Sequence, residues 1–361
     1  MHRRDFLQWS TAALAAGYAI GPGDVAAAMQ AGSQSEAQSN EAAKPGIVGG
    51  PPVLQSPASD GVTVFQGVRG ISTAWVEYGL TPRLDQRADT MRHGLLPLNG
   101  LVHRVRLDGL KPGTVYHYRV GVCPIDFRGA YKITRHPVEY TPIHTFRTLD
   151  SQDGRGGFFV INDTHENMDT LRGAGAQLAA ARARQRKAGL PGDGPTFWNG
   201  DIFNDVRSDA QIGANILMPP ISEDAPGAKL GYASSSPMCF VSGNHDVRGI
   251  HARSLDLFVD TPGGVRHAVI RHGPIAFIVL DTGEDKPDDR PGYAGLGAFA
   301  AYRELQRAWL EQALKRPEVK QAEHRVVIQH IPMWHGGSSD DARAKWGPLL
   351  AKAGITAMIC G

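Results

Sequence analysis

The sequence has little of several features that would assign it to a class. It contains only three cysteines in 361 residues, Cys123, Cys239 and Cys360. An odd and sparse set without C-x-x-C spacing predicts neither a disulfide framework nor a thiolate metal site. The net charge is only +2, so we expect no patch for binding nucleic acid.

Other absences exclude whole mechanisms. No apolar run reaches about 18 uninterrupted residues, so the mature protein is predicted to lack a membrane span. The G-x-S-x-G elbow of serine hydrolases and the G-x-x-x-x-G-K-[ST] phosphate loop do not occur. Any catalysis must therefore rest on other polar residues.

The N-terminal segment indicates export. In residues 1–30, Arg3 and Arg4 precede an apolar run from Trp9 to Ile20, and small residues follow. The Arg-Arg-x-Phe-Leu pattern resembles a twin-arginine signal, which implies the twin-arginine export machinery as a partner and a periplasmic or secreted protein. The alternative is a basic amphipathic N-terminus that stays attached. Residues 31–52 lack large apolar side chains almost entirely and are predicted to be a disordered linker.

Residues 53–150 have the pattern of a small all-β sandwich. Short alternating strands are predicted at 61–68, 72–78, 103–107, 115–122 and 144–148. The stretch from Leu107 to Val120 contains Pro-Gly-x-x-Tyr and resembles the strand-turn-strand of fibronectin type III-like sandwiches, with Tyr116 as a tyrosine corner. A β-module of another topology is the alternative.

Residues 151–361 alternate apolar strands with helical stretches, which indicates an α/β layer architecture. Strands are predicted at 157–161, 196–198, 238–241, 275–280, 325–329 and 355–360, and helices at 168–187 and 299–315. Ligand sites of such sheets lie beyond the carboxyl ends of the strands. Polar clusters at those ends are therefore the candidates for a functional site.

Four strands end in such clusters. They supply two aspartates, an asparagine and three histidines that could meet at one point: Asp163, His165, Asp201, Asn244, His245 and His330. Asp, Asn and His together suit borderline divalent metals such as Mn, Fe or Zn. A carboxylate after glycine can bridge two ions about 3.5–4 Å apart. Taken singly, Asn244 could mark a turn, Asp201 a helix cap and His330 a core histidine.

The order of these motifs resembles the calcineurin-like metallophosphoesterases. That superfamily carries D-x-H, G-D-x-x-[DN], G-N-H-[DE], a lone His and then G-H-x-H, and the first four occur here in order. The resemblance implies a four-layer αββα sandwich preceded by the small β-sandwich, as in purple acid phosphatases and their relatives. It also implies two divalent metal ions and hydrolysis of phosphate esters.

Roles carried over by this resemblance are residue-specific. Asp163 and His165 would bind the first metal, Asp201 would bridge, and Asn244 and His330 would bind the second. His245 would hold the phosphoryl group and protonate the leaving oxygen as general acid, with Asp246 as its orienter, while a metal-bridging hydroxide attacks phosphorus. Weaker candidates for substrate contacts are Asn204, Arg248 and His335.

Two departures from the family pattern are visible. Asn204 stands where purple acid phosphatases have a tyrosine, so the chain resembles their non-purple relatives. The sequence reaches Gly361 where G-H-x-H would begin, so we expect either a chain truncated at its C-terminus or an incomplete metal site.

The resulting prediction is an exported hydrolase acting on a small-molecule or polymer phosphate ester, with a monoester favoured over a diester. Two alternatives stay open. One is a catalytically weak or inactive metal-binding or surface-binding protein with an incomplete site. The other is a mononuclear metal hydrolase.

Overall fold

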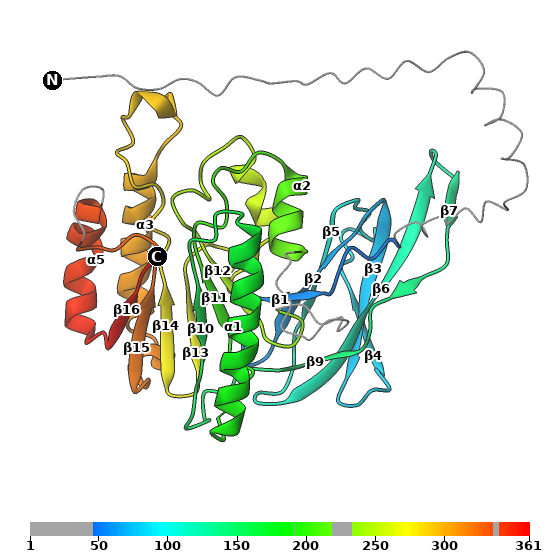
Figure 1. Cartoon of the computed structure of the whole chain (residues 1–361), viewed down its shortest axis with the longest axis horizontal. Helices are drawn as coiled ribbons and strands as arrows, with labels where there is room; N and C mark the ends of the chain where they lie inside the picture. The colour runs from blue at the N-terminus through cyan, green and yellow to red at the C-terminus, as the bar shows by residue number, and fades with distance from the viewer. Residues whose placement is uncertain (1–45, 191, 219–232, 335–338) are drawn as a thin grey trace, which may run out of the picture. The chain divides into compact units, whose positions relative to one another are not determined.

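The computed structural model describes residues 46–190, 192–218, 233–334 and 339–361 (Figure 1). The predicted export signal and residues 31–45 of the predicted linker lie outside these ranges. Residues 46–52, also assigned to the linker, make specific contacts: Val48 forms a β-bridge with Val68, and Ser234 Oγ donates to the Pro52 carbonyl at 3.0 Å. In the described residues, no helix is long and apolar enough to span a membrane.

The N-terminal part consists of nine strands. They are β1 (Val53–Gln55), β2 (Val62–Gly67), β3 (Ser72–Gly79), β4 (Gln86–Asp89), β5 (Val102–Leu107), β6 (Val115–Phe127), β7 (Ile133–Arg135), β8 (Glu139–Tyr140) and β9 (His144–Arg147). Strands β1, β2 and β5 form one layer, and β3, β4, β6 and β9 form the other. Alternating apolar residues of both layers, among them Val64, Val76 and Val120, form a shared core. All five predicted strands are present.

Tyr116 makes the contact predicted for it. Its hydroxyl accepts a hydrogen bond from the Lys111 backbone N–H at 3.0 Å, and its ring stacks on Phe146 with centroids 5.8 Å apart. The side chain is 4% exposed. A buried phenol needs a partner for its hydroxyl, and here that partner fixes the turn before β6.

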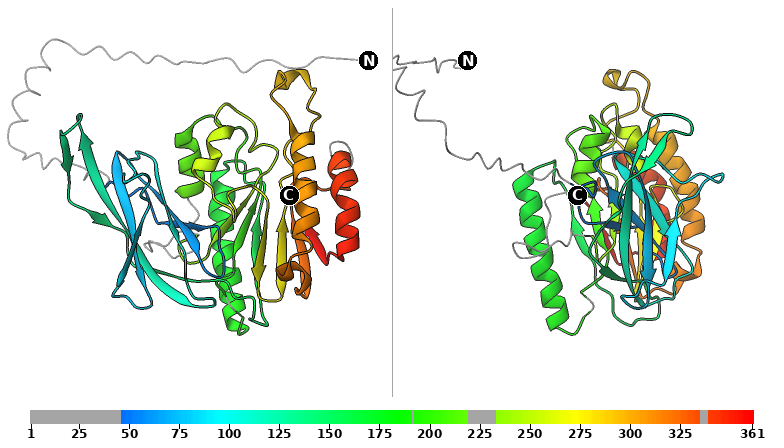
Figure 2. Two further views of the ribbon diagram at one scale, coloured as in Figure 1. Left: turned by 180° about the vertical axis from the view of Figure 1, so that it is seen from behind. Right: turned by 90° about the vertical axis from the view of Figure 1, so that its right-hand side faces the viewer.

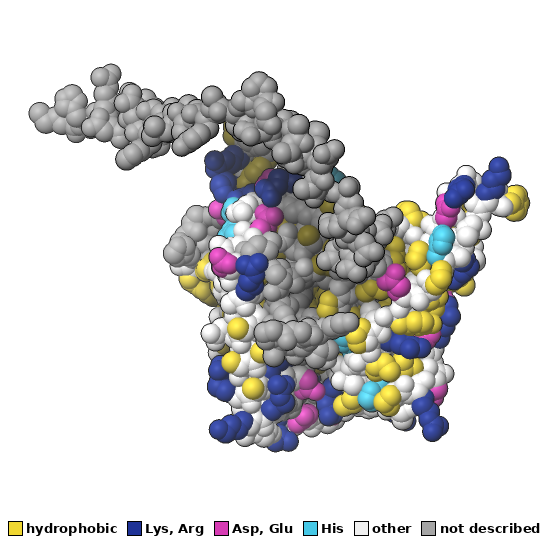
Figure 3. Space-filling model, turned by 45° about the vertical axis from the view of Figure 1, so that its right-hand side comes forward, with side chains coloured by type: hydrophobic (Ala, Val, Ile, Leu, Met, Phe, Trp, Pro, Cys, Tyr) yellow, Lys and Arg dark blue, Asp and Glu magenta, His cyan; other side chains and the backbone are white. Residues whose placement is uncertain are grey.

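Apolar side chains are exposed on this β-rich part. Figure 3 shows yellow side chains among polar and charged ones on the face that is turned to the viewer. Several large apolar residues of the segment between β4 and β5 are exposed, including Met91 (59%) and Leu95 (73%). The polar clusters predicted to carry the chemistry all lie in the other part of the chain.

The second part alternates strands and helices. Its elements are β10 (Phe159–Ile161), α1 (Met168–Lys187), β11 (Thr196–Asn199), α2 (Asp209–Ile212), η1 (Gly213–Leu217), β12 (Met238–Val241), η2 (Ala252–Leu257), β13 (Ala268–His272), β14 (Ile275–Val279), η3 (Pro291–Tyr293), α3 (Phe299–Ala313), α4 (Pro317–Lys320), β15 (His324–Ile328), α5 (Ser339–Ala353) and β16 (Ala357–Ile359). The predicted helix at 168–187 matches α1. Strand β13 and helix α5 were not predicted.

Two sheets face each other in this part. Parallel strands β10, β11 and β12 pack against the sheet β13-β14-β15-β16 through a core that includes Phe197 and Phe277. Helix α1 lies outside the first sheet, and α3 and α5 lie outside the second, as the right-hand view of Figure 2 shows. Leu171 of α1 and Leu310 of α3 anchor these outer layers. The predicted four-layer α/β/β/α arrangement is confirmed.

The two parts share a sheet. Strand β1 pairs in parallel with β12 (Gln55 with Met238), so β10-β11-β12-β1-β2-β5 form one six-stranded sheet. The Gln55 amide closes the junction, donating to the Phe258 carbonyl and accepting from the Asp260 N–H. Sequence patterning separates the parts at residue 150, but Gly46–Gly361 form one compact unit.

Candidate metal centre

The polar clusters lie at the carboxyl ends of β10, β11, β12 and β15, where backbone hydrogen bonds join their loops. The Asp163 N–H donates to the Gly200 carbonyl at 3.1 Å, and the His165 N–H donates to the Asp201 carbonyl at 2.9 Å. The parallel pairing of β10 with β11 sets both loops at the same edge. Segments that are far apart in sequence thus meet at one point.

Asp201 stands at the centre of this point. Its side chain is 6% exposed, and three imidazole Nε2 atoms surround its carboxylate: His330 at 3.3 Å, His165 at 3.6 Å and His245 at 4.0 Å. The potential ligand atoms form two groups within which they lie within 4.8 Å of one another. One group is His165, Asp201 and His245, and the other is Asp163, Asp201 and His330.

These groups fit a pair of divalent metals. Asp201 belongs to both groups, which is the geometry of a bridging carboxylate. Nδ1 of His165 is buried and has no hydrogen-bond partner among the described residues, so this imidazole has unused bonding capacity. Carboxylate and imidazole donors are the set that Mn, Fe and Zn share.

The sequence resemblance paired Asp163 with His165 at the first ion and placed His330 at the second. His165 Nε2 lies 3.9 Å from Asp163 Oδ1, so the predicted pair is close together. Asp163 also groups with His330, and His165 with His245, which was predicted to bind no metal. Asn244, the remaining predicted ligand, is half-buried in the turn after β12.

Three of the clustered residues have strained backbones. Asp163, His165 and Asp201 have φ angles of 54°, 43° and 52°, in the left-handed region that disfavours side chains. Such residues cost about 1–3 kcal/mol each and persist where the surroundings enforce them. Here the strain aims the functional groups of neighbouring loops at one place.

Two glycines permit the close approach of these loops. A Cβ on Gly200 would lie 2.5 Å from His330 Nδ1, and one on Gly243 would lie 2.3 Å from both the backbone N and Oδ1 of Asp201. No side chain fits at either position. The glycines that precede Asp201 and Asn244 are thus part of the site's geometry.

The charges of Asp201 and His330 are coupled. Burial favours the neutral carboxyl of Asp201, but the adjacent His330 outweighs it and lowers its pKa. Burial also disfavours the charged imidazole of His330, yet contact with Asp201 raises its pKa to about 9. A divalent ion held by Asp201 and His330 would take the place of the proton that this pair shares.

Asp246 has a different role from the predicted one. It was expected to orient His245, but it is fully buried and its carboxylate accepts from the backbone N–H groups of Asp201, Ile202, Phe203 and Gly243, at 2.8–3.3 Å. Burial raises its pKa to about 6, against these hydrogen bonds. Asp246 therefore holds the loop that carries Asp201, and it positions the cluster rather than the imidazole.

Other groups orient His245. Its Nδ1 lies 2.7 Å from the Asn204 carbonyl, and its Nε2 lies 2.8 Å from Arg248 Nη1. Because arginine only donates, Nε2 is the acceptor and Nδ1 carries the proton. The backbone carbonyl of Asn204 therefore orients His245, the role that was predicted for Asp246. The side-chain amide of Asn204 donates to the His165 carbonyl at 3.2 Å.

Arg248 is held by two acidic residues that sequence reasoning missed. It donates to both carboxylate oxygens of Glu284, at 2.8 and 2.6 Å, and to Asp285 at 2.9 Å. Glu284 is 1% exposed; burial favours its neutral form, but Arg248 holds its pKa at about 2. The available signal was the acidic pair just after the apolar strand β14, at the same edge as the other clusters.

The remaining candidates are placed as follows. His335 lies outside the described residues, and Trp334 before it is 67% exposed. Glu166, also missed, accepts from the Asn204 N–H at 3.2 Å and from the Gln211 amide at 2.7 Å. It thus braces the loop beside the cluster.

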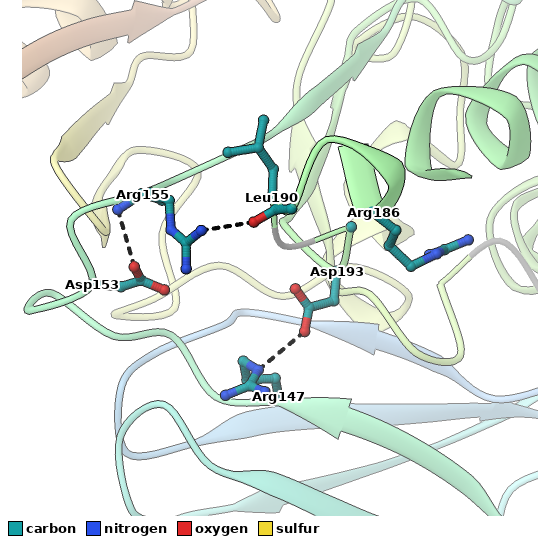
Figure 4. A pocket seen from close by; sticks show the side chains of 8 residues that line it. Arg147, Asp153, Arg155, Arg186, Leu190 and Asp193 are labelled. Atoms are coloured by element: carbon teal, nitrogen blue, oxygen red, sulfur yellow. Dashed lines mark hydrogen bonds and ion pairs between the residues drawn. The ribbon is translucent and has the colours of Figure 1, made fainter. Parts of the chain in front are cut away.

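A hollow lies at the C-terminal end of α1, away from the metal centre. It is lined by Arg147, Arg155, Arg186, Asp153 and Asp193, and Figure 4 shows Arg147 paired with Asp193. The 20-residue helix α1 begins beside the metal cluster and ends here, about 30 Å away. Its mixture of charges and its distance separate this hollow from the metal centre.

The fold and the shared carboxylate define a candidate dinuclear metal site on an α/β/β/α sandwich. Residues 157–361 match the family model described as calcineurin-like phosphoesterase. The chain belongs to this family, whose members use a dinuclear metal centre.

Known proteins agree with this assignment. The serine/threonine-protein phosphatase CPPED1 of Mus musculus is 29% identical over 135 residues, which span 35% of this chain and 40% of that protein. The purple acid phosphatase PPD1 from yellow lupin (Lupinus luteus) has a similar fold, with a TM-score of 0.56 and 15% identity over 86% of this chain and 58% of that one. For PhoD the TM-score is 0.50, with 13% identity over 86% of this chain and 70% of that one.

Proposed function

We propose that this chain is an exported, two-metal phosphoesterase that hydrolyses phosphate monoesters in preference to diesters. The observation that carries the proposal is Asp201, whose buried carboxylate belongs to both potential metal groups. Two divalent ions bound there would supply an activated water and neutralise phosphoryl charge. Residues Asp163, His165, Asp201, Asn244 and His330 are the proposed ligands.

In this proposal His245 contacts the phosphoryl group and donates a proton to the leaving oxygen. Its Nε2 lies 4.0 Å from Asp201 and is engaged by Arg248. Because Nε2 is the acceptor in the structure, donation requires Nε2 to release Arg248 and to take up a proton from solvent. The imidazolium then gives this proton to the leaving oxygen as the ester bond breaks. Asn204 keeps the ring oriented through its carbonyl.

Replacing the shared carboxylate tests the function. We expect Asp201→Asn to lower the hydrolysis of 4-nitrophenyl phosphate at least about a hundredfold and to remove bound metal, because the bridging charge is lost. The measurements are initial rates and metal content by mass spectrometry. The matched control is Asp205→Asn, a change at an exposed carboxylate of the same loop that pairs with Arg207.

Wild-type activity in Asp201→Asn would disprove the proposal. Metal content separates the alternatives: about two ions per chain supports it, one ion with slow turnover supports a mononuclear hydrolase, and none supports a binding protein. Faster hydrolysis of bis(4-nitrophenyl) phosphate than of the monoester would overturn the preference for monoesters.

Export and the type of the β-sandwich are further parts of the proposal. The twin-arginine pattern at Arg3-Arg4 supports export, and the Tyr116–Lys111 hydrogen bond supports a fibronectin type III-like module. Changing both arginines to lysine should retain the protein in the cytoplasmic fraction of an expressing bacterium. Unchanged periplasmic yield would contradict twin-arginine export.

A further inference from the structure

A hollow of about 360 Å³ adjoins the metal cluster on the side of His245. Its lining includes Val247, Arg248, Glu284, Tyr293, Leu296 and Phe299. Arg248 connects it to the cluster, because its Nη1 lies 2.8 Å from His245 Nε2. The volume lies within the range of small-molecule sites.

The charges of Arg248 and Glu284 in this hollow are paired. Both Glu284 oxygens accept from Arg248, and Asp285, outside the lining, accepts from Arg248 and from Lys286. Arg253 also lines the hollow and adds a positive charge. The rest of the lining is the apolar surface of the walls.

Those walls are two rings and an aliphatic side chain. Phe299 packs against Gly283, where a Cβ would lie 2.4 Å from the ring at a φ of +64°. Tyr293 follows the turn of η3, and Leu296, whose N–H donates to the Tyr293 carbonyl at 2.8 Å, is 73% exposed at the rim. Aromatic walls favour a flat apolar ligand, because rings pair edge-to-face or offset-stacked.

The loop that forms this wall is fixed in place. Asp288 accepts from the backbone N–H groups of Phe299 and Ala300, at 2.8 and 2.9 Å, and thereby ties the loop to the start of α3. In Figure 1 this loop rises above α3. The hollow is therefore built by defined contacts before any ligand enters.

We propose that this hollow binds the leaving group and selects phosphate monoesters of aromatic alcohols. The inference rests on the proposed function: if His245 protonates the leaving oxygen, the leaving group must lie on the side of His245. The hollow lies on that side, because Arg248 lines it and contacts His245 Nε2. The rings of Tyr293 and Phe299 favour an aryl group.

The test compares phenyl phosphate with glycerol 2-phosphate in the full chain loaded with metal. We expect Tyr293→Ala and Leu296→Ser to raise KM for phenyl phosphate about three- to tenfold, the effect of losing an aromatic or apolar contact. KM for glycerol 2-phosphate should stay unchanged. For each ester, the KM of the variant is divided by the KM of wild type, so that the different reactivities of the two esters cancel.

Leu305→Ser is the matched control, since Leu305 is 69% exposed on α3 and does not line the hollow. Phenylphosphonate should inhibit wild type more strongly than methylphosphonate, and the Leu296→Ser variant should lose this difference. If wild type hydrolyses both esters but neither variant raises KM for phenyl phosphate selectively, the hollow does not bind the leaving group. The proposed phosphoesterase function would stand in that case. Hydrolysis of neither ester by wild type would overturn both.

Discussion

Buried histidines in the two parts of the molecule have pKa values that are shifted in opposite directions. His103 and His144 in the β-sandwich are 3% and 2% exposed, and His330 at the metal centre is 5% exposed. Burial lowers the pKa of both sandwich histidines to about 4, whereas contact with Asp201 overcomes burial and raises the pKa of His330 to about 9. Burial alone neutralises an imidazole, and a buried carboxylate beside it restores the charge.

The backbones show a related contrast. The turn before β6 is held by the Tyr116 hydroxyl and by Thr148, whereas the metal centre concentrates left-handed Asp163, His165 and Asp201 on loops that only glycine neighbours allow to meet. Left-handed residues of the sandwich, Ser56, Leu84, His93 and Tyr131, stand at separate positions along the chain, whereas those of the site lie on adjoining loops. A conformation that costs free energy in three adjacent places needs a group that enforces it, and Asp246 is the best placed.

The largest expected effect therefore comes from Asp246. We expect Asp246→Asn to reduce the free energy of unfolding by about 3 kcal/mol, because an amide cannot accept all the backbone N–H groups that the carboxylate accepts. Urea denaturation with EDTA present measures this without a contribution from bound metal. Activity should fall as well, since Asp201 loses its support.

Asp256→Asn is the control for this change, because Asp256 is 70% exposed and pairs with Arg266. If Asp246→Asn unfolded at the same urea concentration as the control, the backbone contacts of Asp246 would not hold the loop. Comparable stability with lost activity would instead return Asp246 to the predicted role of orienting His245.

Sequence reasoning succeeded where the pattern is periodic or the motif is contiguous. The range of α1, the strands flanking each polar cluster and the central place of Asp201 all follow from runs of residues adjacent in sequence. The partner of His245 could not follow in this way. His245 and Asp246 are neighbours in sequence, but the turn after β12 directs their side chains to different partners.

The junction between the two parts was missed for a similar reason. Strand β1 has only three residues, and its pairing with β12 joins positions 55 and 238. No local pattern reports a contact of that separation. The roles of Glu284 and Asp285 could not be predicted for the same reason. Both carboxylates pair with Arg248, which lies more than thirty residues away in the sequence.

A smaller effect is expected from the sandwich histidines in acid. Since the folded pKa of His103 is below the ordinary value, its contribution to stability is full above about pH 6.5 and declines toward pH 4, where the unfolded chain binds the proton first. We expect one such histidine to lower the free energy of unfolding by about 2 kcal/mol between pH 7 and pH 5.

Urea denaturation of His103→Gln at both pH values checks this. The variant should be less stable than wild type at pH 7, because the contact with Ser72 changes. The difference in free energy of unfolding between variant and wild type should be smaller at pH 5. His93→Gln, at an exposed position, should keep the wild-type pH dependence. If this difference in free energy were the same at both pH values, His103 would not take up a proton on unfolding.

The smallest effect, about tenfold in kcat, is expected from Glu284→Gln, which changes the partner of Arg248 beside His245. The carboxylate of Glu284 is ionised at any working pH, and it fixes Arg248 against His245. With an amide in its place the guanidinium loses its bidentate partner, and His245 loses its orientation. Because proton donation matters most for poor leaving groups, kcat should fall more for glycerol 2-phosphate than for 4-nitrophenyl phosphate, with KM little changed.

His245→Asn should show the same pattern with a larger loss, and Glu304→Gln, which removes an exposed carboxylate paired with Arg307, should behave as wild type. A merely structural role for Glu284 would lower both rates equally. The ratio of the two kcat values is thus the informative quantity: if it is unchanged, Arg248 does not act through His245, and the paired charges between β14 and the metal centre serve the fold alone.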